Sequence, residues 1–204
     1  RGDHTVLPIF IFDSDILEKL PEDDARVTFI HETLQNIQST LKEEHNSSIA
    51  MFHGKPIDIF KHLVDSYDIG AVYTNHDYEP YAKARDEKVA SFLNENHIEF
   101  KTFKDQVVFE KNEIVKKDGK PYMVYTPYMK LWKSTFRILD FKDFPSETVL
   151  KNLIPTTNLP NLSLSDIGFI KSQQEIKSYL VTSSLIQNYE ATRNFPSQDS
   201  TSKL

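Results

Sequence analysis

The chain contains no cysteine among its 204 residues and has only one tryptophan and three methionines. Without cysteine it can form neither a disulfide nor a thiolate metal site, as is typical of a reducing compartment, and we expect a cytoplasmic protein. Glycine is also scarce, and the five glycines never cluster: Gly2, Gly54, Gly70, Gly119 and Gly168. The sequence therefore lacks a glycine-rich phosphate loop, which disfavours the alternative of a nucleotide-binding α/β domain.

Long apolar runs are absent as well. None approaches the roughly 18 residues that a membrane span needs, so we expect no membrane contact. The seven histidines are scattered, with no pair at ligand spacing on one helix, and this disfavours a metal hydrolase. A net charge of −6 argues against nucleic-acid binding over the whole surface. What remains is a globular chain, 39% hydrophobic and 26% charged, that is long enough for one good core.

Short apolar runs alternate with helical patterns along the first half of the chain. Four runs are expected to be strands, at residues 6–12, 49–53, 69–74 and 98–103. Between them lie helical stripes, of which the first combines Ile30, Leu34, Ile37 and Leu41. This alternation predicts an α/β fold, a Rossmann-like parallel sheet with helices on both faces. A hairpin around Lys117 to Gly119 and a helix from Thr126 should follow.

The stretch from Ile69 to Asp86 is the first place to look for function. Its strand changes abruptly into the turn formers Asn75, His76 and Asp77, and Pro80 suits the first turn of the next helix. Ligands of such sheets sit at the carboxyl ends of the strands. The turn from Asn75 to Tyr81 is therefore a predicted binding site.

Three strings in the sequence are also familiar. They are Asp77-Tyr78-Glu79-Pro80-Tyr81 with Arg85-Asp86, then Pro121-Tyr122 through Thr126-Pro127-Tyr128 to Trp132, and last Tyr189, Arg193 and Phe195-Pro196 with the terminal Asp199 to Leu204. Together they resemble the N-terminal α/β antenna domain of the DNA photolyase and cryptochrome family, followed by the start of its FAD-binding helical domain. The resemblance implies an antenna domain over residues 1–143, a linker over 144–170 and a truncated helical domain over 171–204.

The resemblance implies a fragment of a light-driven flavoprotein. The first expectation is a deoxyribodipyrimidine photolyase, a lyase that repairs pyrimidine dimers in DNA with blue light; the alternative is a cryptochrome-type photoreceptor. The parent would bind FAD and, through its helical domain, damaged DNA, whereas the fragment would be inactive and free of FAD. The residues matching the FAD site, which is incomplete here, are Tyr189, Thr201, Ser202, Lys203 and Leu204.

A second chromophore is the other implied ligand. Family members that bind folate carry an Asn-Glu pair where this chain has Tyr81 and Ala82, so the resemblance favours a deazaflavin or FMN over folate. The residues implied for the antenna site are Asp77, Tyr81, Phe12, Asp13 and Arg26. Three of them also have a structural interpretation: Phe12 as a core residue, Asp13 as a turn residue and Asp77 as the entry to a helix.

Family members begin with a strand that this sequence lacks before Arg1. By resemblance that strand is the central one, in the order 3-2-1-4-5, and its loss would leave unpaired edges on both neighbours. We expect the gap to be filled by a rearranged segment or a neighbouring chain, unless residues were left out of the sequence. Exposed strand edges would also permit non-native self-association.

Overall fold

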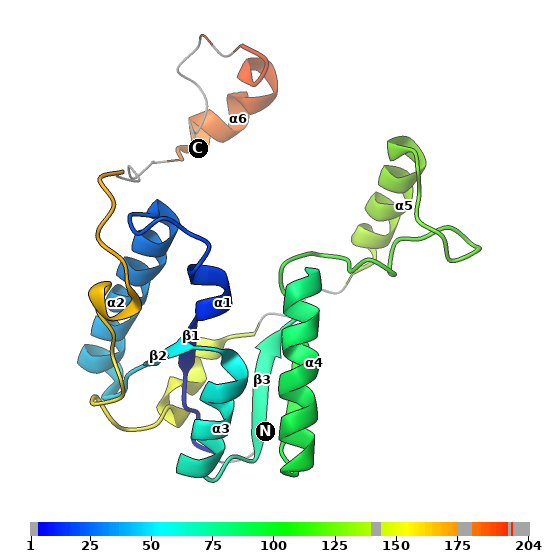
Figure 1. Ribbon diagram of the computed structural model, residues 1–204. Helices are drawn as coiled ribbons and strands as arrows, with labels where there is room; N and C mark the ends of the chain where they lie inside the picture. The colour runs from blue at the N-terminus through cyan, green and yellow to red at the C-terminus, as the bar shows by residue number, and fades with distance from the viewer. Residues whose placement is uncertain (1–3, 140–143, 175–180, 196, 198–204) are drawn as a thin grey trace.

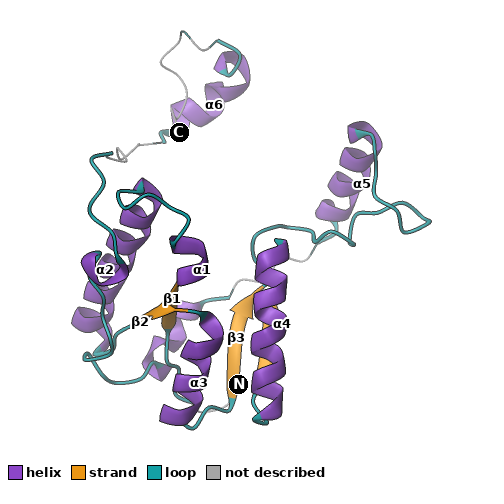
Figure 2. Ribbon diagram, in the orientation of Figure 1, coloured by secondary structure: helices purple, strands orange, loops and turns teal. Residues whose placement is uncertain are grey.

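The computed structural model describes residues 4–139, 144–174, 181–195 and 197, and it is a mixed α/β structure (Figures 1 and 2). The predicted strands and helices of the first 103 residues are all present. In chain order the elements are β1 (Ile9–Asp13), α1 (Ser14–Leu17), α2 (Ala25–His45), β2 (Ala50–Gly54), α3 (Pro56–Ser66), β3 (Ala71–Asn75), α4 (Pro80–Glu95), β4 (Glu99–Phe103), α5 (Tyr125–Arg137), the 3₁₀ helices η1 (Ser146–Asn152) and η2 (Ser165–Ile167), and α6 (Ser183–Thr192).

Local chemistry fixes where the helices begin. The side chain of Asp24 accepts a hydrogen bond from the backbone N–H of Arg26 at 2.9 Å and so caps α2. Helices α3 and α4 both begin with a proline, Pro56 and Pro80, whose missing N–H costs nothing in a first turn. These start signals place each helix directly after a strand, so that it can pack back over the sheet.

The four strands form two separate parallel pairs. β1 pairs with β2 from Ile9 opposite Ala50, and β3 pairs with β4 from Ala71 opposite Glu99. Among the described residues no strand joins β1 to β3, and a cavity of about 1640 Å³ lies along both of them. The expectation that a rearranged segment of the chain fills this gap is therefore wrong for the described residues.

Two apolar clusters form the core. One joins α2 to β1 and β2, and the other joins α3 and α4 to the strands on the opposite side. The first cluster also contains Ile167 and Phe169, which are 2% and 6% exposed. The segment after residue 144 is thus packed against the domain, and Met51 N–H donates to the carbonyl of Pro160 at 2.8 Å along the outer edge of β2.

The remaining segments depart from the expectations. Residues around Gly119 form a turn, closed by the N–H of Gly119 donating to Lys116 O at 2.9 Å, but no described strands flank it. Trp132 packs against Phe109 and Phe136, and α5 projects away from both sheets (Figure 1). In the last part of the chain, α6 begins at Ser183 with Thr182 as its cap.

Within the described residues, no helix is both long enough and apolar enough to cross a membrane.

Candidate functional site

Asp13, at the carboxyl end of β1, is the central residue of the predicted site. Its side chain is 6% exposed in the fold. One carboxylate oxygen accepts from the N–H of Asp15 at 3.0 Å and caps α1, and the other accepts from the hydroxyl of Tyr81 at 2.6 Å. Because Tyr81 lies in the first turn of α4, this bond connects the β1–β2 half of the domain to the half that contains β3 and β4.

The environment keeps Tyr81 protonated. Burial and the hydrogen bond to Asp13 together raise the pKa of the Tyr81 hydroxyl well above its ordinary value of 10.0. The ammonium group of Lys19 lies 5.7 Å from the centre of the Tyr81 ring, within range of a cation–π interaction. Tyr81 is therefore a neutral donor held between a carboxylate and a cation.

The large cavity reaches this edge of the sheets. Its walls here are mainly apolar and come from β1, α1, α2 and α4, with a few charged side chains among them; the lining residues include Phe12, Asp13, Ile16, Val27, Ile30 and Arg85. Burial, the largest single influence, acts to lower the pKa of Arg85, but the hydrogen bond to Asp86 at 2.8 Å and the nearby negative charges of Asp86, Asp77 and Asp13 together raise it. Apolar walls with a few polar groups among them are typical of sites for small organic ligands.

The other predicted antenna residues are placed differently. Phe12 is 3% exposed and lies in the core, with its ring edge-on to Phe10 at 4.9 Å between centroids, while also contributing to the cavity wall. Asp77 accepts from the N–H of Glu79 at 3.1 Å, a local turn that leads into α4, and it does not line the cavity. The structure thus brings Asp13 and Tyr81 together, and it gives Asp77 the role of a helix entry.

Arg26 also lies outside the cavity lining. Its guanidinium pairs with Asp24 at 2.6 Å, and the arginine side chain is 72% exposed. Hydrogen bonding from Arg26 lowers the pKa of Asp24 to about 2. The pair therefore belongs to the start of α2.

A second polar cluster, which the sequence reasoning missed, lies at the ends of β3 and β4. The imidazole of His76 contacts the Glu110 carboxylate through Nδ1 and the Thr102 hydroxyl through Nε2, the latter at 2.9 Å. The hydroxyl of Tyr78 also donates to Glu110, at 3.1 Å. Chiefly because of the bond to His76, the pKa of Glu110 is lowered. We call these four residues the His76 cluster, and it ties the loop after β4 to the sheet edge.

The predicted FAD residues are mostly outside the described part of the chain. Tyr189 lies on α6 and is 55% exposed, whereas Thr201, Ser202, Lys203 and Leu204 lie outside the described residues. Among the residues that are described, no group of three histidine, aspartate or glutamate side chains could hold a metal ion.

The fold and the arrangement of its strand ends agree with the comparisons with known proteins. This chain belongs to the DNA photolyase family, whose sequence profile matches residues 1–149. It is 33% identical to the deoxyribodipyrimidine photo-lyase of Alkalihalophilus pseudofirmus over 153 residues, which is 67% of this chain and 31% of that protein. With the photo-lyase of Synechococcus sp. it is 27% identical over 215 residues, or 98% of this chain and 44% of the relative.

Solved structures show the same fold. A bacterial class III photolyase from Agrobacterium tumefaciens superposes with a TM-score of 0.63 at 19% identity, covering 98% of this chain and 43% of that one. An archaeal photolyase from Sulfolobus tokodaii superposes with a TM-score of 0.50 at 24% identity, covering 67% and 29%. The chain thus spans less than half of the length of these photolyases, and the expected family and α/β fold are confirmed.

Proposed function

We propose that this chain is the light-harvesting part of a photolyase that repairs pyrimidine dimers in DNA with blue light. In this proposal the edge formed by Asp13 and Tyr81 holds a second chromophore of the flavin type, a deazaflavin or FMN. The observation that carries it is the position of Asp13, which lines a large, mainly apolar cavity and is fixed there by a hydrogen bond of 2.6 Å from the hydroxyl of Tyr81. Family membership supports the photolyase assignment over a cryptochrome, because the family profile and the relatives described above are photolyases.

The residues present fit a flat heteroaromatic ligand. The aliphatic side chains of Ile16, Val27 and Ile30 offer an apolar wall to the plane of a ring, and they would exclude water from it. Asp13 and Arg85 lie at the edge of that wall, where a carboxylate can accept and a guanidinium can donate hydrogen bonds to ring heteroatoms. When bound, such a pigment would absorb light and pass the excitation energy to the catalytic FAD.

The folate alternative fits less well. Ala82 is 3% exposed and its methyl side chain offers no hydrogen bond to a pterin. The Tyr81 hydroxyl, next to it in sequence, is already engaged with Asp13. The Sulfolobus tokodaii photolyase structure contains two FAD molecules and implicates a novel light-harvesting cofactor, so FAD belongs among the flavins to be tested.

The remaining part of the proposal concerns the parent protein. Tyr189 and the terminal residues Thr201 to Leu204 would contribute to the site of the catalytic FAD, and damaged DNA would bind to the helical domain. Both assignments rest on the resemblance of the terminal string to the family's FAD-binding loop. A loop of hydroxyl side chains and exposed backbone N–H groups is suited to a diphosphate.

The test is a binding titration of the 204-residue chain with a deazaflavin, FMN, FAD and a reduced folate, followed by fluorescence of each pigment. We expect saturable binding of at least one flavin and none of the folate. Asp13→Asn should weaken flavin binding by about tenfold or more, because a charged hydrogen-bond partner contributes roughly 1.5–3 kcal/mol. The matched control is Asp65→Asn on the exposed face of α3. Equal affinities of the two variants, or binding of the folate alone, would contradict the proposed site.

A further inference from the structure

Positive charge is concentrated in one part of the chain, the turn around Gly119 together with helix α5. Residues 116–137, which we call the basic arm, contain six basic residues and one acidic residue, an excess of five positive charges. Because the whole chain carries −6, its other residues must together carry −11. A protein that is acidic overall and basic in one segment attracts polyanions to that segment alone.

The cations of the basic arm are not neutralised within the fold. The lysines just before the arm are paired, Lys101 with Glu99 and Lys104 with Glu113. By contrast, no ion pair joins a cation of the arm to another described residue; these cations are Lys116, Lys117, Lys120, Lys130, Lys133 and Arg137. All of them except Lys116 are exposed, so their charge can meet a partner.

Helix α5 arranges three of these cations in a line. At about 100° per residue, Lys130, Lys133 and Arg137 fall within about 60° of one another around the helix axis. The helix contains no acidic residue, and it projects away from both sheets into solvent (Figure 1). A line of exposed cations of this kind is suited to follow the backbone of a polyanion.

Exposed tyrosines stand beside this line. Tyr125 begins α5 and is 73% exposed, and Tyr128, one turn further along, is 37% exposed. The ring of Tyr128 lies edge-on to that of Tyr122, at 6.3 Å between centroids. An exposed aromatic ring next to cations is the arrangement on which unpaired bases stack, because every base has a π-face.

A membrane surface fits the basic arm less well. Trp132, on the apolar side of α5, lies edge-on to Phe109 at 5.4 Å and stacks on Phe136 at 4.9 Å between centroids. An interfacial helix inserts its apolar face into the lipid, whereas this face is already engaged. The −11 of the other residues would also be repelled by an anionic bilayer or by a stiff duplex, while a flexible single strand can contact the arm alone.

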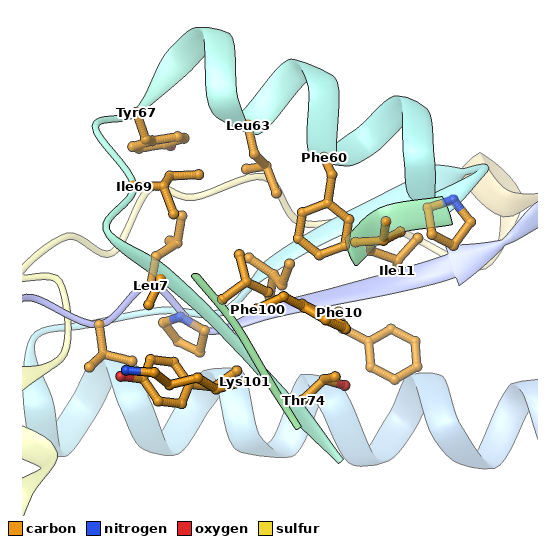
Figure 3. Close-up of a pocket in the computed structure, with 18 of the residues that line it drawn as sticks. Leu7, Phe10, Ile11, Phe60, Leu63, Tyr67, Ile69, Thr74, Phe100 and Lys101 are labelled. Atoms are coloured by element: carbon orange, nitrogen blue, oxygen red, sulfur yellow. The ribbon is translucent and has the colours of Figure 1, made fainter. Parts of the chain in front are cut away.

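The basic arm is separate from the chromophore cavity. That cavity lies along β1 and β3, where Phe60 and Leu63 point into it from α3 (Figure 3), and none of residues 116–137 lines it. We propose that the basic arm binds single-stranded nucleic acid, with phosphates along Lys130, Lys133 and Arg137 and a base stacked on Tyr125. The interaction needs no particular sequence and no pyrimidine dimer, which sets it apart from the binding of damaged DNA by the helical domain.

The test is a fluorescence-anisotropy titration of a labelled, unirradiated oligothymidylate of about 15 nucleotides with the 204-residue chain, repeated over a range of salt concentrations. We expect saturable binding whose logarithm falls with the logarithm of salt at a slope of about −2 to −4, since three to six cations would each displace about 0.7 counterion. Absence of saturable binding at low salt would overturn the proposal.

Charge variants locate the contact. Lys130→Gln, Lys133→Gln and Arg137→Gln together should weaken binding at least tenfold and reduce the salt slope by about 2. The matched control combines Lys42→Gln, Lys83→Gln and Lys151→Gln, which make the same change in net charge at exposed positions outside the arm. Equal losses in the two variants would show an effect of net charge alone and overturn the proposal. Emission from Trp132, the only tryptophan of the chain, reports whether α5 stays packed in each variant.

Variants of Tyr125 test the stacked base. Tyr125→Ala should weaken binding about fivefold or more and leave the salt slope unchanged, whereas Tyr125→Phe keeps the ring and should bind like wild type. Equal affinities of these two variants would overturn the stacking on Tyr125.

Other polyanions test the class of partner. An oligouridylate of the same length should bind about as tightly as the oligothymidylate, because phosphates and base faces are common to both. A duplex of the same length should bind more weakly, because its bases are already stacked on one another. Tighter binding to the duplex, or to phosphatidylserine-containing vesicles, than to the single strand would overturn the proposal.

Discussion

The Asp13–Tyr81 hydrogen bond offers the most direct test of how the two halves of the domain are held together. Tyr81→Phe removes only the hydroxyl, and it leaves the Asp13 carboxylate, which is 6% exposed, with the Asp15 N–H as its remaining described partner. Loss of a hydrogen bond to a charged group costs about 2 kcal/mol. We expect the free energy of unfolding to fall by that amount, and Tm by roughly 4–8 °C for a chain of this size.

Urea unfolding followed by circular dichroism measures the effect, and its pH dependence provides a second readout. Because the folded pKa of Tyr81 is raised above the ordinary value of 10.0, the bond stabilises the fold fully below pH 10 and its contribution declines as the pH rises above that value. The pKa of Tyr78 is also raised, by burial and by Glu110, so wild type retains two such groups. Tyr81→Phe should lose the Tyr81 part of the alkaline decline and keep the Tyr78 part.

Tyr125→Phe is the matched control, because the side chain of Tyr125 is 73% exposed. Its free energy of unfolding should stay within about 0.5 kcal/mol of wild type. If Tyr81→Phe proved no more destabilising than this control, the bond would not connect the two sheets energetically. An unchanged alkaline decline would independently refute the role assigned to the Tyr81 hydroxyl.

Three further substitutions test other parts of the fold. The pKa of Glu110 is held below its ordinary 4.5 mainly by His76, so the His76 cluster should weaken as pH falls below about 4.5, and amide hydrogen exchange in the loop after β4 should then speed up. Glu110→Gln should abolish the part of this increase that is due to Glu110. The part due to Glu113, whose pKa Lys104 lowers, should remain. Leu93→Ala, at a fully buried position, should cost about 3 kcal/mol in urea unfolding. Gly168→Ala should cost about 1 kcal/mol in the same assay, since φ is +82° there and open space surrounds the added methyl.

The order of strands and helices could be predicted because each element carries a local signal. Buried parallel strands are continuous apolar runs, and Asp24, Pro56 and Pro80 mark helix starts within a residue or two. The face that each helix buries was harder to predict. On α2, Ile30 and Ile37 are 40% and 43% exposed, although they belonged to the expected stripe.

Polar residues take the buried positions on α2 because distant partners satisfy them. Gln38, 3% exposed, accepts from the N–H of Ile49 at 2.7 Å, and Thr28, 5% exposed, accepts from the N–H of Ser172 at 3.0 Å. Neither partner can be read from helical periodicity, since one lies beyond the helix and the other lies 144 residues away. The periodic pattern of a helix depends only on the hydrophobicity of its residues, so it cannot indicate a hydrogen bond to a partner that only the fold brings close.

The candidate site likewise contains contacts that the sequence predicted and contacts that it did not. Asp13 and Tyr81 are 68 residues apart, yet both were predicted, because the ends of parallel strands meet at one edge. Asp77 and Arg26 satisfy their polar groups with neighbours two residues away, a local option that competes with a ligand. The pairing of His76 with Glu110 had no sequence signal, because Glu110 lies in a segment without periodicity.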